Sequence, residues 1–144
     1  MTEQNFSNHS RMVPLFHYVG YPLGIFVLVV AGRNIYEACN EHLDLYIPIL
    51  FFAIGLVLMI LLWYARYFAL RAQDRAIRAE ENLRYFAITG NLLDSKLRMA
   101  QIIALRFAPN NELLDLAHRA VSENLSPKDI KKAIQHWKPD YNRV

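Results

Sequence analysis

The amino-acid sequence predicts an all-α protein: a two-helix transmembrane hairpin whose second helix continues as a long cytoplasmic rod, followed by a small three-helix cytoplasmic head. Three observations predict this fold class. Two long runs, 13–32 and 45–65, contain no charged residue. The stretch that follows the second run is rich in alanine, arginine and glutamate and has no glycine or proline before Gly90. Three amphipathic segments then fill the remainder of the chain.

The two uncharged runs predict membrane-spanning helices. An α-helix needs roughly 20 apolar residues to cross a bilayer core about 30 Å thick, and the runs 13–32 and 45–65 have this length. The first run also exceeds the apolar core of a cleaved signal peptide, which is about 7–15 residues long. Because the following GRNIYEAC is a poor cleavage site, we expect a retained span.

The distribution of charge predicts that both termini face the cytoplasm. The N-terminal segment 1–12 contains Arg11, and the expected short external loop 33–44 contains one basic and three acidic residues. The chain after Ala65 contains 14 basic and 9 acidic residues. Since basic residues next to a span stay on the cytoplasmic side, the acidic loop is expected to face outward.

The first run carries features that a plain anchor does not need. Pro22 is expected to kink the helix or interrupt its hydrogen bonds. Gly20 and Gly24 form a small-xxx-small pattern that lets another helix approach closely, although they could equally serve the kink. His17 has two interpretations: a haem or metal ligand, or a neutral imidazole bonded to backbone near the headgroups. Neither run contains a second histidine, which favours the latter.

The segment 66–89 is predicted to extend the second span as a cytoplasmic helix, because its residues are strong helix formers. From Leu45 to about Ile88 such a helix has some 44 residues and a length of roughly 66 Å. Along it, apolar residues recur at alternating steps of three and four, the spacing of a coiled-coil seam. The seam comprises Ala65, Ala69, Ala72, Ala76, Ala79, Leu83 and Phe86. It should pack against another helix, from a second copy, from another subunit, or from the chain's own head, for which Leu83 and Phe86 are the candidates.

Arginines crowd the remaining faces of this segment. Arg66 and Arg71 lie close enough to the second span to contact anionic lipid headgroups, at about 1 kcal/mol per basic residue. For the later arginines we favour a solvated surface with i,i+4 ion pairs. The expected pairs are Asp74–Arg78 and Glu80–Arg84.

Residues 90–144 predict a head of three short helices. Their sequences are DSKLRMAQIIALRFAPN, NNELLDLAHRAVSEN and LSPKDIKKAIQHWKPD. The third has the clearest start, with Ser126 as N-cap, Pro127 at the first helical position and Asp129 at the third. Pro139 is expected to end it. A core of this size is only marginally stable on its own, so packing against the rod should contribute.

No constellation typical of an enzyme is present in the sequence, so we expect no catalytic residue, no metal site and no cofactor. Glu80 and Glu81 are interpreted as an exposed pair, and Cys39, the one cysteine, cannot form an intrachain disulfide. The lysines of the third head helix leave open a nucleic-acid-binding head. Acidic residues alternate with them, so nucleic acid is not the favoured partner.

Four segments resemble an uncharacterised bacterial family of small two-span membrane proteins. They are NHSRMVPLFH, FALRAQDRAIRAEENLR, IALRFAPNNEL and SPKDIKKAIQHWKPDYNRV. The resemblance covers most of the chain and implies a protein of the bacterial inner membrane with no assigned activity. It supplies no catalytic or cofactor residue.

The favoured hypothesis is a non-enzymatic integral inner-membrane protein that acts through helix packing. It would be a homo-oligomer or an accessory subunit of a larger membrane complex, with lipids and either itself or another inner-membrane protein as partners. Two alternatives remain. One is a haem-bearing accessory of an electron-transfer complex with His17 as ligand. The other is a membrane-tethered nucleic-acid-binding regulator.

Overall fold

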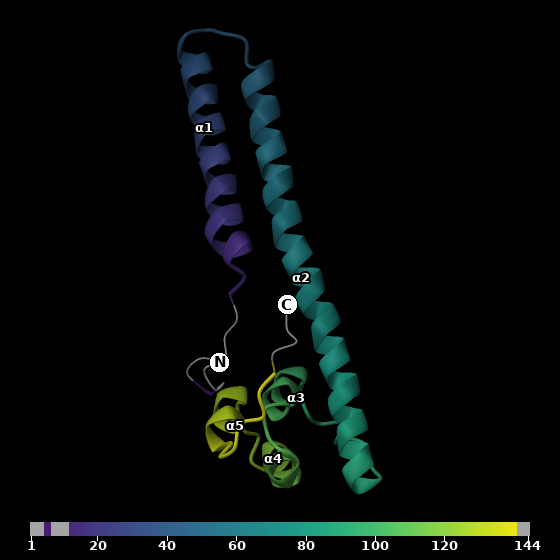
Figure 1. Cartoon of the computed structure of the whole chain (residues 1–144). Coiled ribbons are helices and arrows are strands. Elements are labelled where there is room, and N and C mark those ends of the chain that lie inside the picture. The colour runs from purple at the N-terminus through teal and green to yellow at the C-terminus, as the bar shows by residue number, and fades with distance from the viewer. Residues whose placement is uncertain (1–4, 7–11, 141–144) are drawn as a thin grey trace. The chain divides into compact units, whose positions relative to one another are not determined.

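The computed structural model describes residues 5–6 and 12–140, and this part of the chain is all-helical, without a β-strand. The elements are η1 Leu15–Gly20, α1 Tyr21–Asn40, α2 Tyr46–Thr89, α3 Met99–Leu105, α4 Asn110–Ser122 and α5 Pro127–Ala133 (Figure 1). The predicted all-α class, with two long apolar helices and a small helical C-terminal part, is confirmed. The chain divides into two compact units, one comprising Met12–Ala69 and the other containing Leu70 onwards. The helix α2 contributes to both.

In the first unit, α1 and the first part of α2 form an antiparallel hairpin (Figure 1). Both helices are long and apolar enough to cross a membrane, in the stretches Leu15–Asn40 and Tyr46–Thr89. Gly24 of α1 faces Met59 of α2, and Gly55 of α2 faces Leu28 of α1. Glycines on both helices therefore bring the two backbones close together.

The first helix ends later than the sequence predicted. It continues through Arg33 to Asn40, so the segment 33–44, expected to be a loop, is helical over its first eight residues. No glycine or proline interrupts it there, and Arg33 pairs with Glu37 one turn on, at 2.7 Å. Ala38 is buried. Local helix propensity and this packing together keep the segment helical.

Pro22 coincides with a change in the helical hydrogen bonding. The residues before it, Leu15–Gly20, form a π-helix, and the N–H of Tyr21 donates to the carbonyl of Phe16. Proline has no N–H, and its ring clashes with the carbonyl four residues earlier in a regular α-helix. The predicted interruption of the ladder is therefore present as a switch from π- to α-helix.

The helix α2 is continuous over 44 residues, from Tyr46 to Thr89. Its length agrees with the prediction, because strong helix formers fill the stretch beyond the apolar run. It ends where Gly90 adopts a positive φ of 75°, a backbone conformation that residues other than glycine rarely adopt. The N–H of Gly90 donates to the carbonyl of Phe86 at 2.8 Å and closes the last turn.

The second unit contains the helical head, in which α3, α4 and α5 surround one apolar core. Its largest fully buried side chains are Phe107, Ile102, Leu105, Leu113 and Ile130. The predicted start of α5 is confirmed: Pro127 begins the helix and the Ser126 hydroxyl accepts the N–H of Asp129 at 3.1 Å. The first head helix begins only at Met99, because the carboxylate of Asp94 accepts the N–H of Lys96 and forms a turn there instead.

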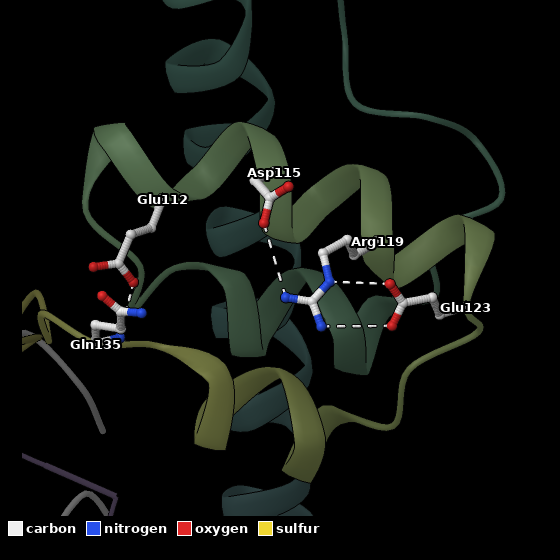
Figure 2. Close-up of polar contacts among 5 residues, drawn as sticks. All are labelled: Glu112, Asp115, Arg119, Glu123 and Gln135. Atoms are coloured by element: carbon white, nitrogen blue, oxygen red, sulfur yellow. Dashed lines mark hydrogen bonds and ion pairs between the residues drawn. The ribbon is translucent and has the colours of Figure 1, made fainter.

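The last helix also differs from the prediction, since α5 ends at Ala133 and not near Pro139. Glu112 of α4 is responsible. Its carboxylate accepts the backbone N–H groups of Gln135 at 2.9 Å and His136 at 3.0 Å, which a continuing helix would use internally. Figure 2 shows Glu112 directed at Gln135, while Arg119 on the same helix lies between Asp115 and Glu123. The non-helical end places Trp137 against Phe107, with ring centroids 4.9 Å apart.

The Glu112 contact predicts a pH dependence of head stability. Burial raises the pKa of Glu112, but hydrogen bonds from Gln135 and His136 outweigh it and leave the pKa below its ordinary value of 4.5. A carboxylate with a lowered folded-state pKa stabilises the fold fully above the unfolded-state value, and this contribution is lost as pH falls through the folded-state value. We expect the free energy of unfolding to fall below about pH 4.5, and Glu112→Gln to flatten that fall. Denaturant titrations at neutral pH and at about pH 3.5 measure the effect. Glu123→Gln is the control, and an equally flattened profile in it would contradict the assignment.

Candidate functional site: two faces of the long helix

One face of α2 carries the head within the second unit. Ile77 and Glu81 are buried there, and Tyr85 packs against the head core. Asn82 accepts the backbone N–H of Leu93 at 3.3 Å, which ties the segment after the helix back onto it. This face is therefore partly apolar and partly polar.

Arg84 makes the most extensive polar contact on this face. Its guanidinium donates to the carbonyl oxygen of Ala108 at 2.7 Å and to the side chain of Asn110 at 2.8 Å. It also pairs with the carboxylate of Glu81 at 3.0 Å. The interpretation of Glu81 as exposed and the expected Glu80–Arg84 pair are both wrong, because Arg84 must reach the head and Glu81 lies beside it. A planar guanidinium with several donors suits such a junction between two elements.

The predicted seam lies on a different face of α2, which the head leaves open. Leu83 is 68% exposed and Phe86 is 49% exposed, and Ala72, Ala76 and Ala79 are exposed as well. The expectation that the head packs on Leu83 and Phe86 is therefore wrong. At 3.6 residues per turn, the head-bearing residues occupy another side of the helix. Packing of the seam against a second copy or another protein stays a prediction.

The glycines of the first unit contact the chain's own second span. A Cβ added at Gly20 would lie 3.9 Å from Leu62, which is an ordinary contact, whereas one at Gly24 would overlap Met59. Gly55, which sequence reasoning did not single out, is also closely packed, against two side chains: its Cβ would meet Leu28 at 2.9 Å and Val27 at 3.4 Å. The signal was available, because Gly55 is the one glycine in the run 45–65.

The remaining predicted site residues lie as follows. The Nδ1 atom of His17 is 2.9 Å from the carbonyl oxygen and 3.1 Å from the nitrogen of Val13, so the backbone of the first turn engages it. In the described part of the chain, no group of three or more His, Cys, Asp or Glu side chains could hold a metal ion. Ala65 is exposed, and Ala69 and Arg66 are half-buried.

Arg71, the other residue expected at lipid headgroups, is exposed on α2. Aromatic side chains lie close to both arginines on the helix: the rings of Tyr64 and Tyr67 each lie near Phe68, at centroid distances of 5.4 and 5.7 Å. Aromatic residues of this kind are typical of the interface between a bilayer and water. A role in contacting lipid stays a prediction for Arg66 and Arg71.

A groove of about 430 Å3 lies beside α2 within the second unit. Its polar lining includes Arg106, which is mostly buried and pairs with Asp140 at 3.3 Å. The guanidinium also lies over the ring of Phe107, 4.6 Å from its centroid. Glu80, Glu81 and Lys138 complete the charged lining, so acidic and basic groups are close to balance. The groove contains no nucleophile with an adjacent base, and its pairing of charges stabilises the C-terminal segment.

Comparison with known sequences decides the family. The chain belongs to a family of unknown function, DUF6526, whose model matches residues 1–144. The resemblance to an uncharacterised family is thus confirmed over the whole chain. No curated protein and no solved structure matches this chain.

The glycine contacts predict unequal tolerance to substitution in the hairpin. Gly55→Val should overpack the contact with Leu28 and Val27 and lower the free energy of unfolding by about 1–3 kcal/mol relative to Gly32→Val. At Gly32 an added Cβ meets only Phe52, at 3.8 Å. Thermal unfolding of both full-length variants in mild detergent, followed by circular dichroism, compares them. Equal stabilities would show that Gly55 is not a point of close helix approach.

The Arg84 contacts predict a large cost for removing this one side chain. Arg84→Leu leaves the Glu81 carboxylate without its partner and should destabilise the head by about 3 kcal/mol. Arg78→Leu, an exposed arginine on the same helix, is the matched control and should change little. Replacing Glu81 by leucine as well should recover part of the loss, because the isolated charge is then gone. Limited proteolysis of the head measures the relative stability of these variants. Equal protection of the Arg84 and Arg78 variants would contradict the prediction.

Proposed function

We propose that this protein is a non-enzymatic integral protein of the bacterial inner membrane that acts by packing the seam of α2 against another helix. It would do so as a homo-oligomer or as an accessory subunit of a larger membrane complex. The observation that carries the proposal is the open seam. Leu83 and Phe86 are large apolar side chains that the folded chain leaves exposed in the charge-rich segment 66–89 of α2.

Membrane insertion is supported by the exposure of the hairpin. Only a small share of the most apolar stretch of each long helix is buried inside the chain. Large side chains such as Phe26, Phe51 and Leu61 are more than half exposed. Exposing apolar area to water costs about 25 cal/mol per Å2, so an apolar surface of this extent calls for lipid. The core helix of a water-soluble protein would be mostly buried instead.

The charge distribution supports the proposed orientation. Arg66 follows the second apolar run directly and Arg71 lies five residues further on, whereas the turn between the helices carries Glu41 and Asp44. Basic residues beside a span favour the cytoplasmic side. The head and both termini would then lie in the cytoplasm, where the open seam could meet a partner.

A packing role for the seam follows from its composition. Alanines at the contact positions let a neighbouring backbone approach closely, and Leu83 and Phe86 supply most of the apolar area. The head does not cover them, because it is bound through Arg84 and Ile77 on another side of α2. The seam residues from Ala72 to Phe86 thus stay exposed, and Ala76 among them also borders the groove beside the C-terminal segment.

The test compares two leucines with nearly equal exposure. Leu83 on the seam is 68% exposed and Leu92, beyond the end of α2, is 66% exposed. Leu83→Glu should weaken assembly roughly tenfold or more, because a carboxylate buried in an apolar contact is strongly disfavoured. Leu92→Glu should leave assembly unchanged. Particle mass by light scattering in mild detergent, with mass-spectrometric identification of co-purifying proteins, measures both variants. Unchanged mass and unchanged partners in Leu83→Glu would refute the proposal.

A further inference from the structure

We infer that the partner of the seam is a second copy of this chain, packed parallel and in register as a short two-stranded coiled coil over Ala72–Phe86. The inference rests on the proposed function and specifies its partner. It is drawn from the apolar positions of the seam together with the charged residues that flank them.

The seam fits the heptad pattern of a coiled coil. Its steps of four and three place Ala76 and Leu83 at positions a, and Ala72, Ala79 and Phe86 at positions d. The alanines bring the two backbones close, and Leu83 and Phe86 form the bulky layers at the far end. All five residues are exposed within the chain.

The flanking charges decide between orientations. Arg75 precedes position a and is therefore a g residue, and Glu80 follows position d and is an e residue. In a parallel pair, a g residue faces the e residue five positions later on the partner, and such pairs set partner choice and orientation. Arg75 of each copy would thus face Glu80 of the other. Glu80 also borders the groove described above, yet it stays exposed.

An antiparallel pair would not bring these charges together. In that orientation g positions face g positions and e positions face e positions. The g residues of the seam are Arg75 and Asn82, and the e residues are Gln73, Glu80 and Ala87, so no residue of opposite charge is offered to Arg75. The charge pattern is complementary to itself in the parallel orientation only.

Membrane insertion imposes the same orientation. Because α2 is continuous from its apolar run to Thr89, copies inserted in the same direction present their seams in parallel. A two-fold axis along the membrane normal then relates them, and the interface closes on itself as in most homodimers. The Arg75–Glu80 contact would occur twice, once on each side of the seam.

Cysteine cross-linking of the full chain in membranes tests the register. In a background carrying Cys39→Ser, the Leu83→Cys substitution places one thiol on each copy at heptad position a. In a parallel in-register pair these two thiols face each other and are within reach of a disulfide. Mild oxidation should yield a species of twice 16.8 kDa. Arg78→Cys, on an exposed position away from the seam, is the matched control and should yield little. Equal yields at both positions, or no dimer at position 83, would overturn the inference.

Charge exchange tests the orientation. Arg75→Glu and Glu80→Arg should each lower the cross-link yield of the Leu83→Cys protein roughly threefold to tenfold, and the double exchange should restore it. Arg78→Glu should have no such effect. Loss without restoration, or no loss, would refute the parallel pairing.

The two proposals fail in different ways. If Leu83→Glu removes a co-purifying protein while the cysteine at position 83 cross-links to a chain of another mass, helix packing stands and the second copy is excluded. If Leu83→Glu changes neither mass nor partners, the seam has no packing role and both proposals fall.

Discussion

The structure depends on one constraint: the backbone of α2 satisfies its own hydrogen bonds without a break from Tyr46 to Thr89. In a lipid environment, unsatisfied backbone groups cost several kcal/mol each, so a helix is the form such an apolar segment must take. Beyond the apolar run, alanine, arginine and glutamate continue the helix by their intrinsic propensity. The same helix thereby pairs with α1 in one unit and carries the head in the other.

The two contacts of α2 work by different physics. Against α1, small residues dominate, because Gly24 and Gly55 admit Met59 and Leu28 at close range. Close packing of this kind drives helix association where no water is present to supply a hydrophobic force. Against the head, Arg84 bridges to the carbonyl of Ala108 and the side chain of Asn110, so polar geometry positions the two elements. The apolar seam is not the main support of either contact.

That separation is the reason why the proposed function rests on the seam. A helix that bound its own head through Leu83 and Phe86 would have little apolar surface left for a partner. Here Ile77, Glu81 and Arg84 carry the head, and the exposed apolar side chains remain on another side. The cost of exposing them in an isolated chain is a physical reason to expect a covering partner.

The sequence alone determined the features that local chemistry controls. The helical class, the length of α2, its end at Gly90 and the Ser126 cap of α5 follow from propensity and from side chains within a few residues. Only the tertiary structure decided which face of α2 carries the head, because Arg84 finds its acceptors 24 and 26 residues further along the chain. The early end of α5 depends in the same way on Glu112, which reaches Gln135 from α4, and the close approach at Gly55 depends on Leu28 of α1. Contacts between distant residues have no periodic signature in the sequence, so they become visible only once the elements are packed.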